Sequence, residues 1–380
     1  MDHLSLYIHI PFCARKCRYC DFFSVKYDRT AASAYLSALG REIDLCRKSG
    51  LFDDAVEIRT VFIGGGTPSV LAYDELRRLC TLVRDFFNLA ASCEWTVECN
   101  PESFTDNKAL VLRESGVTRL SFGFQSLHDT ELRLLGRIHS AGQCLQLLRD
   151  PMLTNFSSIG IDLMYGLPGQ SIASLEESLS AITRSPVVGH ISAYELTIAE
   201  GTLFGRHRTL LPLPSDDAMA SITDRVWRLL QEAGFEQYEV SNFAKHGHAC
   251  RHNEAYWDHQ PYLGLGCAAH SFLYGQRFAN VRDIDQYAAM IAAGRLPREF
   301  VETMDRRRLA MEMVFLGLRR TRGIDEDAFF EKCGIPFREF TRREKIEEFA
   351  AAGLLRHEKP FLRPTPQGLL RADAIAAAII

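Results

Sequence analysis

Residues 4–20, LSLYIHIPFCARKCRYC, join a short apolar run to three closely spaced cysteines. The run at 4–10 is rich in β-branched and aromatic residues, which predicts a strand. Cys13, Cys17 and Cys20 follow at once, in the spacing C-x3-C-x2-C. Thiolates are soft ligands that suit iron–sulfur clusters and zinc, and one loop lets three of them share a metal centre. The segment therefore predicts a metal site directly after the first strand.

Strand-like runs recur along the first half of the chain and alternate with stretches of helical periodicity. The predicted strands are 4–10, 59–63, 95–99, 119–123, 158–164 and 190–196. The predicted helices are 30–48, 73–87, 105–115, 143–149 and 174–184. Such alternation predicts an α/β fold with a parallel sheet, either doubly wound or a partial (β/α) barrel. In both folds, ligands bind at the carboxyl ends of the strands.

The pattern changes after Thr197. We expect a loop at 201–214, a helix at 216–233, a strand at 237–242, a helix at 305–320 and a hairpin at 354–365. The predicted domains are an α/β domain at 1–200, either a doubly wound sheet or a partial barrel, a linker or α+β extension at 201–300, and a carboxy-terminal domain at 301–380 that resembles a small winged-helix-like module.

Composition limits the classes of function. The chain has 380 residues, 47% of them hydrophobic, and a formal net charge of −4, which disfavours nucleic acid as a partner. The amino terminus does not resemble a signal peptide, and no uncharged apolar run reaches the length of a membrane span, so we expect a cytoplasmic protein. Cysteines scattered outside the triplet are expected to be buried thiols rather than disulfides.

Two other uses of the cysteine triplet remain open on the residues alone. A structural zinc site usually has four protein ligands, but no second CxxC is present. A redox dithiol needs two cysteines rather than three.

Polar residues that could bind a ligand lie at or just beyond the ends of the later strands. The run Gly64-Gly65-Gly66-Thr67-Pro68 comes after the strand at 59–63, and glycines allow close approach to main-chain groups. Glu98 and Asp162 suit hydroxyl or ammonium groups, and Arg137 suits a carboxylate. Taken singly, each is equally well explained as a turn or as a satisfied polar group at the mouth of a barrel.

The cysteine spacing, with Tyr19 before the last thiol, resembles the signature of the radical S-adenosylmethionine (SAM) superfamily. This resemblance implies a partial (β/α)6 barrel similar to a TIM barrel. It also implies a [4Fe–4S] cluster on the three cysteines, whose open iron is chelated by SAM and whose electron cleaves SAM to a 5′-deoxyadenosyl radical. The residues that match SAM-binding positions are Tyr7, Tyr19, Gly64, Gly65, Gly66, Thr67, Glu98, Gln125, Arg137 and Asp162.

Longer segments resemble one group of the superfamily, which contains oxygen-independent coproporphyrinogen III oxidase and a related heme chaperone. These segments are HIPFC (9–13), GGGTPS (64–69), FGFQS (122–126), IDLMYGLPGQ (161–170) and FLGLRRTRGI (315–324). The oxidase has a fourth cysteine two residues after the triplet, where this chain has Phe22, and an amino-terminal extension for which this sequence leaves no room. The resemblance thus favours a heme chaperone, with oxidative decarboxylation of coproporphyrinogen III as the alternative.

A second motif, HNxxYW, lies at 252–257 and is associated with heme binding in the chaperone group. A neutral imidazole can ligate heme iron, and aromatic faces can support a porphyrin. The predicted heme residues are His252, Asn253, Tyr256 and Trp257, while His246, His248, Cys250, His259, Cys267 and His270 could compete as ligands. The expected partners are heme or porphyrin, an electron donor and a membrane-bound hemoprotein acceptor, which would bring the protein to the membrane surface.

Overall fold

The computed structural model describes residues 2–380 and is built on one sheet of twelve strands. At its centre lie six parallel strands, arranged in the order in which they occur in the chain. They are β1 (His3–Ile10), β4 (Glu57–Gly65), β5 (Asn88–Cys99), β6 (Arg119–Gln125), β7 (Ser158–Tyr165) and β8 (Val188–Glu195). All six predicted strands are present. Because their order never reverses, the sheet is a barrel wall rather than a doubly wound sheet.

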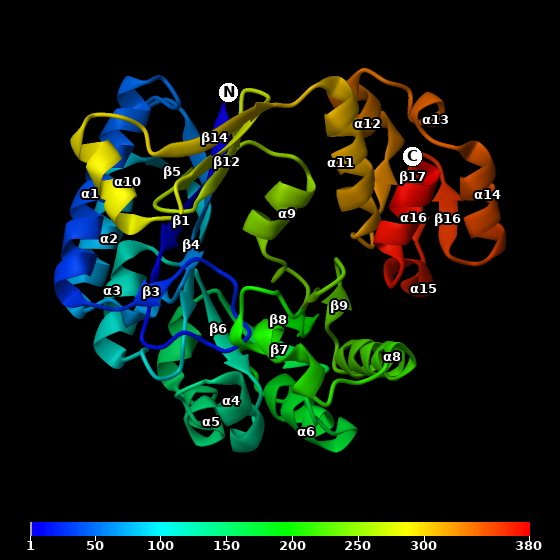
Figure 1. The fold of residues 1–380 in the computed structure, drawn as a ribbon, viewed down its shortest axis with the longest axis horizontal. Helices are drawn as coiled ribbons and strands as arrows, with labels where there is room; N and C mark the ends of the chain where they lie inside the picture. Colours follow the sequence, from blue (N-terminus) through cyan, green and yellow to red (C-terminus); the bar gives the residue numbers. More distant parts are fainter. Residues whose placement is uncertain (1) are drawn as a thin grey trace.

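Helices connect these strands and cover the outer face of the sheet (Figure 1). They are α1 (Arg29–Lys48), α2 (Tyr73–Phe86), α3 (Asp106–Ser115), α4 (Asp129–Leu135), α5 (Ala141–Leu147) and α6 (Ile172–Thr183). Local sequence sets their ends: Asp28 accepts the amide of Ala31 at the start of α1, and Gly136 takes a left-handed conformation after α4. Helix α4, only seven residues long, was not predicted.

The segment predicted as a linker or extension adds strands to both edges of the barrel sheet. Strand β11 (Tyr262–Leu265) pairs in parallel with β1, and β12 (His270–Leu273), β13 (Gln276–Asn280) and β14 (Arg298–Thr303) follow antiparallel. At the other edge, β10 (Asn242–Ala244) pairs with β8 and with β9 (Glu236–Gln237). Among the described residues, the outermost strands β14 and β9 do not pair with each other, so the barrel stays partial.

Two predictions in this region are wrong. The strand at 237–242 is interrupted, because Tyr238 N–H donates to the carbonyl of Asn242 and Val240 N–H donates to that of Arg319. The loop at 201–214 contains a short helix, α7 (Leu203–Arg206), and a 3-10 turn at Arg208–Leu210. The helix predicted at 216–233 is confirmed as α8 (Asp216–Glu232). Two further helices are α9 (Arg251–Trp257) and α10 (Ile284–Ala292).

The carboxy-terminal residues form a module with its own apolar core, which includes Val314, Phe329 and Leu362. Its elements are α11 (Arg306–Leu318), β15 (Ile324–Asp325), α12 (Glu326–Cys333), α13 (Phe337–Phe340), α14 (Arg343–Ala351), β16 (Leu355–Glu358), β17 (Phe361–Pro364), α15 (Pro366–Leu369) and α16 (Ala372–Ile379). The predicted helix at 305–320 and hairpin at 354–365 are both present. In Figure 1, α9 lies between this module and the barrel wall.

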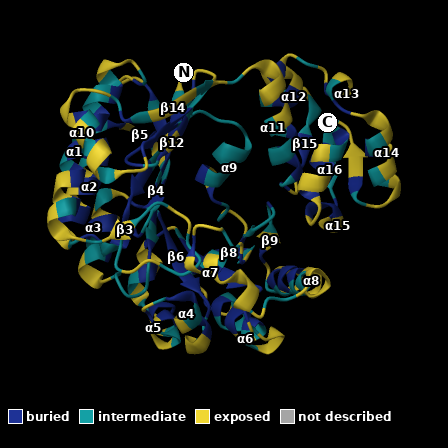
Figure 2. Ribbon diagram, viewed as in Figure 1, coloured by how far each residue is buried: buried dark blue, intermediate teal, exposed yellow. Residues whose placement is uncertain are grey.

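Burial follows these layers. Every residue of β6 is buried, as expected for a central parallel strand covered on both faces. The outer faces of the helices are exposed, and the strands are the most continuously buried elements (Figure 2). Within residues 2–380, no helix has the length and apolar character needed to cross a membrane.

Candidate functional site: a cysteine pocket beside a larger cavity

The three predicted cysteines lie on a loop that is closed at its base. Strand β2 (Phe12–Cys13) pairs in parallel with β3 (Val25–Lys26). Further along, Arg18 N–H donates to the carbonyl of Leu135, and Phe204 N–H donates to that of Arg18. The loop is therefore held at both ends and in the middle. All three thiols are free and partly buried, and burial raises the pKa of Cys13 and Cys20.

The loop forms one wall of a pocket of about 130 Å³, which we call the cysteine pocket. Most of the residues predicted for the cluster and SAM line it together: Cys13, Cys17, Tyr19, Cys20, Gly65, Gly66, Thr67, Glu98, Gln125, Arg137 and Asp162. Two predicted residues, Gly64 and Tyr7, do not line this pocket. Gly64 packs against the Glu98 carboxylate, and Tyr7 lines a neighbouring cavity.

The donor set fits an iron–sulfur cluster better than a single ion. Among residues 2–380, no group of three or more Cys, His, Asp or Glu side chains lies close enough to hold one metal ion. Thiolates around a multi-iron cluster stand farther apart than those around a single tetrahedral zinc, so three separated thiols lining one pocket suit the cluster. Arg137 Nη1 lies 3.5 Å from Cys17 Sγ, and Thr67 Oγ1 lies 3.6 Å from Cys13 Sγ. Both groups can donate to cluster-bound sulfur.

The glycines at 64–66 leave space for neighbouring groups that a larger side chain would displace. A Cβ on Gly64 would lie 2.7 Å from a carboxylate oxygen of Glu98, and one on Gly66 would lie 2.6 Å from the carbonyl oxygen of Phe12. The amides of Gly66 and Thr67 donate to the carbonyls of Ile10 and Phe12. The glycines therefore let the end of β4 pack against the cysteine loop and the Glu98 carboxylate.

Two carboxylates at the pocket lack an ion-pair partner among the described residues. Glu98 accepts the amide of Gly65, and Asp162 accepts the hydroxyl of Ser121. Burial, reinforced by the nearby Asp162, raises the pKa of Glu98 to about 8, and burial also raises the pKa of Asp162. A ligand with hydroxyl groups and a positive charge, such as SAM, would satisfy both carboxylates.

Two residues of the site were missed from the sequence. Asn100 donates to Thr67 Oγ1 at 3.1 Å and accepts from Arg137 Nη2 at 2.6 Å, so it orients both side chains. Tyr194, at the end of β8, donates to Gln125 Oε1 at 2.8 Å. Asn100 directly follows the last residue of β5, two positions after Glu98. Its place at the carboxyl end of a strand was the one sequence feature that could have identified it.

The Glu98→Gln variant is expected to stabilise the protein without cluster or SAM at pH 8, and to leave its stability unchanged at pH 4. The folded pKa of Glu98 is about 8, whereas an unfolded Glu titrates near 4.3. The protonated Glu98 carboxyl therefore stabilises the folded state fully below about pH 4.3, and this contribution is lost as the pH rises towards 8. Thermal unfolding at several pH values checks this, with Glu57→Gln at a partly exposed position as control. Identical pH profiles for wild type and Glu98→Gln would contradict it.

The HNxxYW residues lie on α9 and do not share one pocket. The His252 ring is buried against Phe62, and its nitrogens lie 2.8 Å from Thr60 Oγ1 and 2.9 Å from Tyr256 Oη. Both nitrogens are therefore engaged, and burial lowers the pKa of His252 to about 3.

The other three residues of the motif face different spaces. Asn253 lines a cavity of about 470 Å³ inside the barrel, and Trp257 lines a small pocket beside the carboxy-terminal module. Tyr256 lines a third space, a cavity of about 530 Å³ that we call the outer cavity. The four residues therefore do not form a single surface for a porphyrin in this structure, and their assignment to heme stays a prediction.

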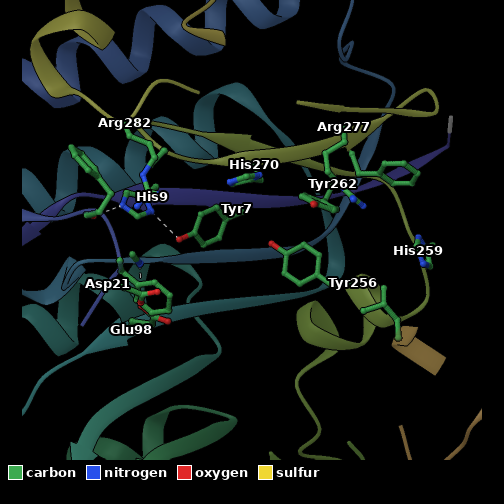
Figure 3. Close-up of a pocket in the computed structure, with 16 residues that line it drawn as sticks. Tyr7, His9, Asp21, Glu98, Tyr256, His259, Tyr262, His270, Arg277 and Arg282 are labelled. Atoms are coloured by element: carbon green, nitrogen blue, oxygen red, sulfur yellow. Dashed lines mark hydrogen bonds between the residues drawn. The ribbon is translucent and has the colours of Figure 1, made fainter. Parts of the chain in front are cut away.

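The outer cavity lies between the β1–β11–β12–β13 part of the sheet and Tyr256 of α9 (Figure 3). Leu316 of α11 also lines it. Its lining combines aromatic, imidazole and guanidinium groups, among them Tyr7, His9, Tyr256, His259, Tyr262, His270, Phe272, Arg277 and Arg282. Glu98 and Phe22 line both this cavity and the cysteine pocket, so the two spaces adjoin.

Comparisons with known proteins agree with this geometry. A profile of the radical SAM superfamily matches residues 7–182, and one of the HemN C-terminal domain matches residues 304–371. The heme chaperone HemW of Bacillus subtilis (strain 168) is 33% identical, over 99% of both chains. HemW of Mycobacterium tuberculosis (strain ATCC 25618 / H37Rv) is 35% identical, over 99% of this chain and 94% of its own.

The fold is also that of a solved structure, coproporphyrinogen III oxidase (HemN) from Escherichia coli. The TM-score is 0.86 with 23% identity, covering 99% of this chain and 89% of that one. The barrel and its cysteine pocket are those of a radical SAM protein. Within that class, this chain belongs to the family of the heme chaperone HemW.

Proposed function

We propose that this protein is a heme chaperone that binds heme beside a SAM-ligated [4Fe–4S] cluster and passes it to a respiratory hemoprotein. The observation that carries the proposal is the outer cavity, whose volume of about 530 Å³ lies in the usual range for a bound organic ligand. Its aromatic walls suit the apolar macrocycle, its histidines suit iron, and its arginines suit carboxylates. The full-length similarity to heme chaperones supports the same assignment.

The cluster and SAM are assigned to the cysteine pocket, with Cys13, Cys17 and Cys20 as iron ligands. The bound cluster supplies one-electron chemistry. The chain's own contribution is to position these groups: Asn100 fixes Arg137 near Cys17, and Glu98 stands between the pocket and the outer cavity. A heme in the outer cavity would thus lie next to the cluster.

Phe22 favours the chaperone over the oxidase. Phe22 is 65% exposed and lines both cavities, and it stands where the resemblance assigns a fourth cysteine to the oxidase. The oxidase remains the second candidate, because a tetrapyrrole in the outer cavity would also lie within reach of chemistry at the cysteine pocket.

Two assays on anaerobic, cluster-loaded protein separate the candidates. The chaperone should retain about one heme per chain, transfer it to a membrane fraction that contains the heme-free acceptor, and form no protoporphyrinogen from coproporphyrinogen III with SAM and a reductant. Sustained protoporphyrinogen formation would refute the chaperone and establish the oxidase. Faster transfer to the acceptor in its membrane than to the same acceptor in detergent would support a cytoplasmic protein that meets its acceptor at the membrane surface.

A further inference from the structure

Histidines are the natural iron ligands of the outer cavity, and three of them line it: His9, His259 and His270. They differ in whether a ring nitrogen is available. The nitrogens of His9 lie 3.1 Å from Tyr7 Oη and 2.9 Å from the carbonyl oxygen of Phe23, so both are engaged. His9 would have to break one of these bonds to reach iron.

The availability of His259 is limited by burial. Its side chain is only 4% exposed, with Nδ1 4.0 Å from a carboxylate oxygen of Glu312. Its Nε2 has no hydrogen-bond partner but is covered by protein atoms. An iron could reach this nitrogen only if the atoms that cover it moved.

His270 is exposed, and its ring makes no hydrogen bond or ion pair within residues 2–380. It begins β12, and Phe272, two residues later on the same face, also lines the cavity. Partial desolvation by the cavity wall and the neighbouring Arg277 and Arg282 lower the pKa of His270, so the ring is neutral at pH 7 and keeps a lone pair for a metal.

A cation suited to a carboxylate lies beside this histidine. Arg282 is exposed, lines the cavity and takes part in no ion pair within residues 2–380. Arg277 also lines the cavity, but both of its terminal nitrogens bind the carboxylate of Glu312. Figure 3 shows His270 on the sheet wall with Arg282 on one side and Arg277 on the other. Arg282 is thus the guanidinium available for a new anion.

We infer that His270 is the axial ligand of the bound heme iron and that Arg282 binds a heme propionate, with the macrocycle lying in the outer cavity against Tyr256, Phe22 and Leu316. This assignment rests on the proposed heme binding and differs from the one that the HNxxYW motif suggests, because His252 is buried with both nitrogens engaged. Helix α9 then supports the cavity through Tyr256, and His252 holds the Tyr256 hydroxyl in place.

The test is a heme titration followed by absorption and EPR spectroscopy on wild type and single variants. His270→Ala should weaken heme binding by more than about tenfold and shift the Soret band and the EPR g-values. Added imidazole should restore the wild-type spectrum, which a merely structural role would not explain. Arg282→Ala should weaken binding while leaving the spectrum unchanged, and should lose its effect with heme dimethyl ester.

His207→Ala is the matched control, because His207 is exposed and lines none of the three cavities. The inference is overturned if His270→Ala keeps the wild-type spectrum and affinity. It is equally overturned if a folded His259→Ala or His252→Gln variant loses the axial ligand while His270→Ala does not. Absence of heme binding by wild type is a different result, because it refutes the proposed function itself.

Discussion

Replacing Cys13, Cys17 and Cys20 together by alanine is expected to reduce the cluster content from about four irons per chain to almost none. The three thiols line the cysteine pocket, and among residues 2–380 the one further cysteine that lines it is Cys99, which is buried on β5. Iron and sulfide analysis after anaerobic reconstitution measures the loss. Burial raises the pKa of Cys13 and Cys20, so cluster assembly should also release protons and become weaker as the pH falls.

The fold should survive this substitution, since all three side chains are partly exposed and the loop is held by main-chain hydrogen bonds. Cys93→Ala provides the matched control, because it removes a partly buried thiol that lies on β5, outside the cysteine pocket. A triple variant that still holds a [4Fe–4S] cluster would contradict the assignment of the ligands.

Glu42→Ala is expected to lower the free energy of unfolding by about 3–5 kcal/mol, because it leaves several buried donors without their shared acceptor. The Glu42 carboxylate is buried and accepts hydrogen bonds from the amide of Gly266, Asn280 Nδ2 and Tyr287 Oη. It thereby ties α1 to β13, to α10 and to the turn that precedes His270. Without it, three donors would be buried without a partner.

Chemical denaturation of wild type and Glu42→Ala measures this loss of stability. Glu42→Gln should lose less stability, because it keeps one acceptor oxygen. Burial raises the pKa of Glu42 to about 7 despite these hydrogen bonds. The protonated carboxyl thus stabilises the fold fully below the unfolded pKa, and this contribution is lost as the pH rises towards 7. A loss below 1 kcal/mol in Glu42→Ala would show that the network does not hold the turn.

The barrel could be predicted because its signals are local. Each central strand contains a short, mainly apolar run such as 158–164, and the site residues lie at or just beyond the ends of those runs, as Glu98 and Gln125 do. Parallel strands bring their carboxyl ends to one edge, so order along the chain was enough to place these residues together.

The added strands at the sheet edge and the surroundings of His252 depend on contacts between segments that are distant in the sequence. Strand β11 has four residues and is defined by pairing with β1, while the burial of His252 follows from Thr60 and Phe62 on β4. Neither contact leaves a periodic signal in the sequence. The HNxxYW motif therefore directed the heme assignment to His252. The exposed ring of His270 makes it the better candidate in the structure, although the sequence offered it only as one of several competing ligands.

Heme bound beside the cluster is tested most directly by the EPR spectrum of the reduced [4Fe–4S] cluster, recorded with and without one equivalent of heme. Glu98 and Phe22 line both the cysteine pocket and the outer cavity, so a paramagnetic ferrous heme should broaden the cluster signal and speed its relaxation. Carbon monoxide, which makes the ferrous heme diamagnetic, should remove the effect. A cluster signal that is unchanged by tightly bound heme would place the heme elsewhere and contradict the account.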